Sequence, residues 1–262
     1  MRYIKLYLYF FIQNLKAKLE YRIDFIIGII ATIMIQATGF AFISIVFTKI
    51  PNINGWSMYE VALIYGLAGA GRGITEFFFD SVWYLSWDYI REGKLDHILH
   101  RPISPLFHIM ADRVETHGLG NFCGGFAIVI ISLIKLKVPF SAVNIIFIPL
   151  VMFSGGLIHF AINLFLSSIA FRLIDLRHLL DTADAFSLLG KYPVTIYPQF
   201  LKNIITFILP FAFVGFFPAA FLLNKTMYGF IGAFSPIVAL TAVLLAVGFF
   251  NYNLKYYESS GS

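Results

Sequence analysis

The first long apolar run of the chain decides its fold class. Residues Phe25–Phe47 read FIIGIIATIMIQATGFAFISIVF and contain no charged side chain. About 20 consecutive apolar residues are enough to cross the hydrocarbon core of a bilayer as a helix. Every backbone polar group in lipid must be bonded within its own segment. The run therefore predicts a membrane-spanning helix.

The whole chain is too apolar for a soluble protein. It has 262 residues, of which 59% are hydrophobic and 13% charged, with a mean hydropathy of +0.82. Soluble domains are about 45–50% apolar and about 25% charged. The composition excludes a soluble globular fold, and it predicts an all-α polytopic membrane protein forming a single transmembrane domain over residues 1–262.

Six crossings are expected. The predicted spans are Phe25–Phe47, Met58–Phe79, one within Leu106–Leu133, Ile145–Phe171, one between Leu179 and Leu223, and Phe230–Phe250. Two alternatives stay open for the fifth span. Either 179–192 crosses and 201–223 dips in and out, or 201–223 alone crosses, which hydropathy favours.

The basic residues flank the apolar runs and orient the chain. The formal net charge is +5, and with the N-terminus inside, the inner segments hold roughly twice as many Lys and Arg as the outer ones. This bias predicts that both termini are cytoplasmic. Residues 1–22 form an amphipathic pattern typical of a helix lying in the headgroup layer. These charges indicate contact with lipid headgroups and not with nucleic acid.

Several charges fall within or beside the predicted spans. Arg72 and Glu76 are four residues apart in the second span, close enough to pair, whereas Asp112, Arg113 and Glu115 crowd the start of the third. Charges at membrane depth usually face a bundle interior or a wet cavity. One interpretation is a polar translocation path or gate. The other is an ion-pair network that locks the second and third spans together, and for Asp112 and Arg113 also a headgroup location.

No residue pattern predicts catalysis or a bound cofactor. The chain lacks the GxxxxGK[ST] phosphate-binding loop. Ser154 and His159 are five residues apart and point to different faces of a helix. His97 and His100 fit a solvated helix end better than a metal site. A stand-alone channel or an intramembrane enzyme remains the alternative to a transporter. Two GxxxG pairs, Gly69/Gly73 and Gly120/Gly124, predict close helix packing.

The longest polar stretch between spans runs from Trp87 to Pro105. Its centre reads REGKLDHILHRP over residues 91–102, which predicts a short cytoplasmic helix with an apolar edge of Leu95, Ile98 and Leu99. An apolar edge on a charged helix is typical of helix-in-groove recognition by another protein.

Several short motifs together carry a family resemblance. They are YRIDF at 21–25, GWS at 55–57, GKLD at 93–96, RPISP at 101–105, KYP at 191–193, IYP at 196–198, LPFA at 209–212 and FPA at 217–219. With them the chain resembles the permease subunits of type-2 ABC exporters, in the branch of formerly uncharacterised transport-system permeases. The resemblance covers nearly the whole chain.

The resemblance implies six spans, an interfacial helix at 1–22, a coupling helix within 87–105 and a re-entrant outer segment at 193–224 before the last span. It favours 179–192 as the fifth crossing. It also implies a second permease, identical or homologous, and two ATPase subunits that carry ATP and Mg, in a prokaryotic cytoplasmic membrane. The expected ATPase-coupling residues are Glu92, Gly93, Leu95, Asp96 and Leu99, with Arg101 and Pro102 fixing the helix end.

Overall fold

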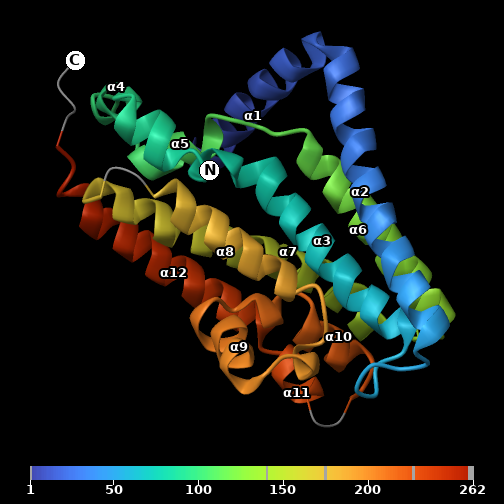
Figure 1. Cartoon of the computed structure of the whole chain (residues 1–262). Coiled ribbons are helices and arrows are strands. Elements are labelled where there is room, and N and C mark those ends of the chain that lie inside the picture. The colour runs from blue at the N-terminus through green and yellow to red at the C-terminus, as the bar shows by residue number, and fades with distance from the viewer. Residues whose placement is uncertain (1, 140, 174–175, 226–227, 259–262) are drawn as a thin grey trace.

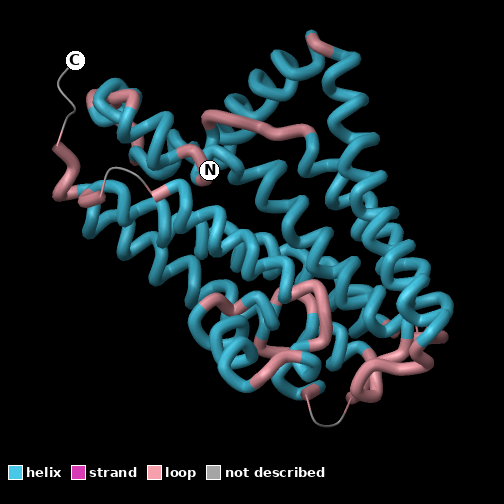
Figure 2. Tube along the Cα trace, viewed as in Figure 1, coloured by secondary structure: helices cyan, strands magenta, loops and turns pink. Residues whose placement is uncertain are grey.

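The computed structural model describes residues 2–139, 141–173, 176–225 and 228–258, and these form helices joined by short loops (Figure 2). The α-helices are α1 (Arg2–Glu20), α2 (Arg22–Lys49), α3 (Met58–Phe79), α4 (Lys94–Leu99), α5 (Pro105–Ala111), α6 (His117–Lys135), α7 (Ala142–Ser167), α8 (Arg177–Leu189), α9 (Gln199–Asn203), α10 (Phe216–Leu222), α11 (Gly229–Gly232) and α12 (Ser235–Leu254). Short 3-10 helices lie at η1 (Asp80–Val82), η3 (Ser168–Phe171), η4 (Val194–Ile196) and η6 (Phe211–Phe213), and π-helical turns lie at η2 (Leu85–Arg91) and η5 (Ile204–Ile208).

Four of these helices are long and apolar enough to cross a membrane: α2, α6, α7 extended by η3, and α12. A fifth candidate is the pair Gln199–Ile208 and Phe211–Leu222, which is bent by 74°. The chain is therefore a helical membrane protein. Helix α3 falls outside this set and contains Arg72 and Glu76, and α8 has only 13 residues. Six crossings remain a prediction in which α3 and α8 supply the other two.

Helix α3 lies at the centre of the molecule. It begins at a capping box, in which the Glu60 carboxylate accepts the Ser57 backbone N–H at 2.8 Å. It packs most extensively against α6 and also against α7, so that α2 and α6 lie on one side of it and α7, α8 and α12 on the other (Figure 1). Most residues between Val61 and Thr75 are buried, and a central position explains how this helix tolerates charged side chains.

Both predicted glycine pairs lie at close helix contacts. A Cβ on Gly73 would collide with the backbone of Gly118 and Phe122 in α6, and a Cβ on Gly120 would collide with Thr32 and Ile29 in α2. The absence of side chains lets the helix backbones approach each other, as the spacing predicts.

The predicted third span, within Leu106–Leu133, lies for the most part in α6 (His117–Lys135), which is long and apolar enough to cross a membrane. Ahead of this span the helix breaks after α5 and starts again at α6, leaving 112–116 as a non-helical connection. Two hydrogen bonds to other segments of the chain stabilise the break. The Asn14 side chain donates to the Ala111 carbonyl at 2.9 Å, and the Arg113 N–H donates to Ser81 Oγ at 3.0 Å. Backbone groups that are hydrogen-bonded to side chains of other segments do not extend the helical hydrogen-bond pattern here.

The two ends of the bundle differ in structure. Helices α9, α10 and α11 gather at one end, whereas α4 and the C-terminal end of α12 lie at the other (Figure 1). Helix α1 turns sharply from α2 near Tyr21 and packs on α5, with the Tyr3 and Phe107 rings 5.2 Å apart. Leu8 and Tyr9 of α1 are exposed, as expected of a helix with a lipid-facing side.

Candidate functional site

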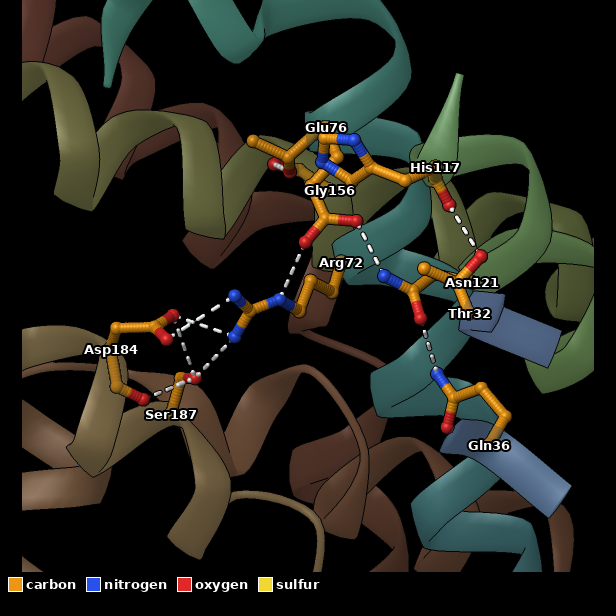
Figure 3. A network of polar contacts seen from close by, with 10 residues as sticks. Thr32, Gln36, Arg72, Glu76, His117, Asn121, Gly156, Asp184 and Ser187 are labelled. Carbon is orange, nitrogen blue, oxygen red and sulfur yellow. Dashed lines mark hydrogen bonds and ion pairs between the residues drawn. The ribbon is translucent and has the colours of Figure 1, made fainter. Parts of the chain in front are cut away.

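The predicted pair in α3 is the centre of a larger polar network (Figure 3). Arg72 Nε donates to Glu76 Oε1 at 2.7 Å, across one helical turn. The same guanidinium reaches α8, where its Nη1 and Nη2 donate to the two carboxylate oxygens of Asp184 at 2.6 and 3.2 Å. Ser187 lies beside this contact, 3.4 Å from Arg72 Nη1. Arg72 thus joins α3 to α8 through a bidentate, charge-assisted contact.

The network continues into α6 and α2 through side-chain amides. Asn121 donates to Glu76 Oε2 at 2.6 Å and accepts from Gln36 Nε2 at 3.2 Å. On another face of α3, the Thr75 hydroxyl donates to the Gly156 carbonyl of α7 at 2.6 Å. Four helices around α3 are therefore tied to it by polar contacts (Figure 3). In a low-dielectric interior such contacts fix one arrangement of the helices, because an unpaired group is costly there.

A cavity of about 240 Å³ opens beside this network. Its walls come from α3, η1, the residues after η1, α6, α7 and α8. The lining residues are Arg72, Thr75, Glu76, Asp80, Trp83, Tyr84, His117, His159, Asn163 and Asp184. It is a mixed polar and aromatic chamber, and of the predicted path residues it contains only Arg72 and Glu76.

Asp80 lies in this wall just beyond the end of α3. Its Oδ2 is shut off from solvent and has no hydrogen-bond partner among the described residues. The pKa of Asp80 is raised to about 7, chiefly by burial and then by the nearby carboxylates of Glu115 and Glu76, against the opposite effect of Arg113 and Lys18. A buried carboxyl without a partner is disfavoured in its charged form.

The other predicted path residues, Asp112, Arg113 and Glu115, lie outside the cavity. They belong to the non-helical connection at 112–116, and their contacts join this connection to η2 and α1. Asp88 in η2 forms an ion pair with Arg113, and Tyr89 donates a hydrogen bond to Asp112. Glu115 accepts from Lys18 of α1, with Nζ–O distances of 2.9 and 3.0 Å. The structure does not bring Asp112, Arg113 and Glu115 into the Arg72 network.

Two of the three residues of the predicted apolar edge of α4, Leu95 and Ile98, face inward. Leu95 is fully buried and Ile98 nearly so, in a cluster with Leu85, Tyr89 and Ile109. Gly93 precedes the helix with φ of 70°, a left-handed conformation that glycine adopts without strain.

The half-buried Asp96 acts on Tyr257 beyond α12: burial, and then the Asp96 carboxylate, raise the pKa of that tyrosine to about 12. Leu95 and Asp96 were expected to contact another protein, but both face their own chain.

The outer side of this segment is charged, with one apolar residue. The exposed residues are Arg91, Glu92, Lys94, His97, Leu99, His100, Arg101 and Pro102. Leu99 is 41% exposed. Arg101 Nη1 lies 3.2 Å from His108 Nε2 of α5, a contact between the residues that follow α4 and the next helix.

Sequence reasoning missed Asp80, Asn121 and Asp184 as members of the site. Asp184 is not among the candidate site residues that the sequence singles out. Its actual partner Arg72 is 112 residues away. A carboxylate in a helical segment that one of the open topologies makes a membrane span was the available signal.

Among the described residues, no group of three or more His, Cys, Asp and Glu is placed to hold a metal ion. Ser154 Oγ donates to the Leu150 carbonyl at 2.7 Å, and the His159 ring stacks near Phe211, so these two residues do not pair.

A comparison with protein-family models matches residues 33–261 to the model described as ABC-2 family transporter protein. The chain belongs to the ABC-2 transporter family. Searches of curated proteins and of solved structures each found no match. Membership confirms the resemblance carried by the sequence motifs. Proteins of this family are membrane components of transporters, they are generally not catalytic by themselves, and they typically work with an ATPase partner.

Proposed function

We propose that this ABC-2 protein is the permease subunit of an ATP-driven exporter, forming half of the translocation path and coupling to a separate ATPase. The observation that carries the proposal is α4, a short helix anchored by its buried edge and presenting a charged surface around Leu99. A loop that only connected two spans has no need of such an anchored surface. ATP and Mg belong to the ATPase, because this chain has no GxxxxGK[ST] motif.

The docking surface consists of Leu99 and the exposed residues around it, Glu92, Arg101 and Pro102 among them. Leu99 enters an apolar depression of the ATPase, and the charges around it set orientation. Leu95 acts differently from expectation: its burial against η2 and α5 makes α4 a rigid part of the permease. A rigid contact transmits displacement, whereas a loose one absorbs it.

A continuous path runs from α4 to the polar network. Through η2 and η1 the chain leads directly from α4 back to α3. The Asp88–Arg113 ion pair links this segment to the connection before α6, and Lys18–Glu115 links the same connection to α1. Movement of α4 with the ATPase therefore displaces α3 and α6, the helices that hold Arg72 and Asn121. Coupling requires that α4 bind the two ATPase states with different free energies.

The complete transporter has two permeases and two ATPase subunits. The permease crosses a prokaryotic cytoplasmic membrane six times with both termini inside, and α1 lies in the headgroup layer. The sharp bend between α9 and α10 supports the re-entrant assignment of residues 193–224, which leaves α8 as the fifth crossing. Helix α8 then contributes Asp184 to the polar network between the spans.

Capture of the partner with a matched pair of variants tests the proposal. The tagged chain is purified in mild detergent from its native host, and co-purifying proteins are quantified by mass spectrometry. We expect a protein with a GxxxxGK[ST] motif in roughly stoichiometric amount, lost in Leu99→Asp and retained in Leu173→Asp. Leu173 is 58% exposed but lies outside the α4 segment. A Leu99→Asp chain that inserts and retains the ATPase contradicts the proposed docking surface.

A further inference from the structure

The cavity beside α3 has more acidic than basic groups. Arg72 is its only arginine or lysine among the lining residues, against the carboxylates of Glu76, Asp80 and Asp184. Glu76 and Asp184 are both satisfied by Arg72, and Glu76 also by Asn121. Counted over the lining residues alone, three ionised carboxylates against Arg72 give a formal charge of −2, with Arg113 and Lys18 close to Asp80 outside the lining.

Two polar side chains in the wall are left without partners. The Asp80 carboxylate makes no hydrogen bond or ion pair with any described residue, and its Oδ2 is inaccessible to solvent. His159 is 8% exposed, and its imidazole has a ring contact with Phe211 but no hydrogen bond within the described chain. Such groups cost free energy when buried alone. The place of Asp80 in a cavity wall points to a cationic ligand that pairs with its carboxylate.

The remaining walls suit an organic cation. Trp83 and Tyr84 line the cavity next to Asp80, and the Tyr84 ring already has the Arg113 guanidinium 4.7 Å from its centroid, which shows that this ring attracts a cation. Aromatic faces attract ammonium groups, and quaternary ammonium ions are recognised in this way. The described residues offer no cluster for a metal ion. The volume of about 240 Å³ lies below that of pockets for drug-sized ligands and so admits one small molecule.

We infer that this cavity binds a small organic ammonium ion, whose charge pairs with Asp80 and whose body lies against Trp83 and Tyr84. The inference rests on the proposed function, because it assigns a substrate class to the same translocation path. Asp80 and Trp83 follow the end of α3 that leads to α4. On the proposed topology this is the cytoplasmic end of α3, the side from which an exporter takes its substrate.

Calorimetric titration with benzyltrimethylammonium tests the inference, because its charge does not depend on pH. The full chain, with whatever proteins co-purify, is placed in lipid nanodiscs. We expect saturable binding to the wild type, weakened roughly tenfold or more in Asp80→Asn, since a contact to a charged group is lost. Trp83→Leu weakens binding severalfold. Asp181→Asn removes an exposed carboxylate of α8 outside the cavity and leaves the affinity unchanged.

Absence of saturable binding to the wild type overturns the inference, and so does equal affinity of Asp80→Asn and wild type. Benzenesulfonate, an anion of similar shape, serves as the negative control. The ATPase content of the same nanodiscs separates the two proposals. A chain that holds its ATPase but no ammonium ion contradicts only the substrate class. A chain that binds the ammonium ion through Asp80 but never associates with an ATPase contradicts the proposed function.

Discussion

Arg72 satisfies two carboxylates on two different helices. Its guanidinium is planar and presents N–H groups in several directions, so Nε serves Glu76 while the two Nη atoms serve Asp184. The side chain is 27% exposed in the isolated chain, so the cavity keeps part of it hydrated. Loss of the guanidinium leaves both carboxylates without their cation, in a place where unpaired charge is costly.

Arg72→Gln is therefore expected to destabilise the protein. Removing one partner of a buried pair costs about 3–5 kcal/mol, and partial exposure reduces this to roughly 2–3 kcal/mol. The apparent Tm in detergent measures the loss. The double variant Arg72→Gln/Asp184→Asn is expected to recover part of it, as coupled residues do. If the Tm losses of Arg72→Gln and Asp184→Asn, each measured alone, simply add in the double variant, the ion pair between α3 and α8 contributes nothing to stability.

Asp80 gives a pH dependence of stability with a defined sign. Its pKa is raised from 3.8 to about 7 in the folded chain, so the folded state binds the proton more tightly than the unfolded state. The free-energy cost of holding Asp80 ionised in the folded chain is absent below about pH 4 and fully present above about pH 7. The free energy of unfolding therefore falls as pH rises through this window.

Asp80→Asn is expected to raise the apparent Tm at pH 8 and to change it little near pH 4. Thermal melts of the variant and of wild type, both without ligand, measure this difference. An equal effect at both pH values contradicts the raised pKa.

Residues near each other in sequence were the predictable part of the site. The Arg72–Glu76 pair follows from helical spacing. The partners Asp184 and Asn121 are 112 and 45 residues away from Arg72 and Glu76, and no single sequence states which helices face each other. Leu95 shows another limit. Spacing places it on an apolar edge, but it does not tell whether that edge meets its own chain or another protein.

At the scale of elements, the contact of α3 with α6 depends on glycine. A Cβ at Gly73 meets backbone atoms of Gly118 and Phe122, which cannot move without displacing the whole helix. Gly248 of α12, by contrast, has open space where its Cβ would stand. The two positions form a matched pair within helices.

Gly73→Ala is expected to lower the apparent Tm by several degrees, because overpacking costs roughly 1–3 kcal/mol. Gly248→Ala is expected to be neutral or to stabilise by up to about 1 kcal/mol, through the higher helix propensity of alanine. Melts of both variants under one condition provide the comparison. A Gly73→Ala protein as stable as Gly248→Ala contradicts the close approach of α3 and α6.

Elements were predicted best where one local rule dominates. The apolar run at 25–47 falls within α2, and the GxxxG pairs mark real helix contacts. The break between α5 and α6 was missed because distant groups, Asn14 and Ser81, hold it. Helix α3 is predictable from its pattern, but its central position depends on packing by its neighbours.

At the scale of the whole molecule, orientation is the open prediction, because it rests on the distribution of Lys and Arg. In a Cys123→Ser background, Lys49→Cys lies at the end of α2 and Ser104→Cys lies between α4 and α5, and both positions are exposed. An impermeant maleimide is expected to label position 49 in intact cells and position 104 only after permeabilisation. Labelling in the reverse order inverts the topology and places α4 where no cytoplasmic ATPase reaches it.

Photo-crosslinking from position 99 tests the central claim most directly. A photoreactive amino acid replaces Leu99 in one chain and Leu173 in another, and adducts formed in native membranes are identified by mass spectrometry. The account predicts an adduct at position 99 with a protein carrying a GxxxxGK[ST] motif, and none with that protein at position 173. An inserted chain that gives no such adduct at position 99, or gives it equally from both positions, contradicts coupling through α4.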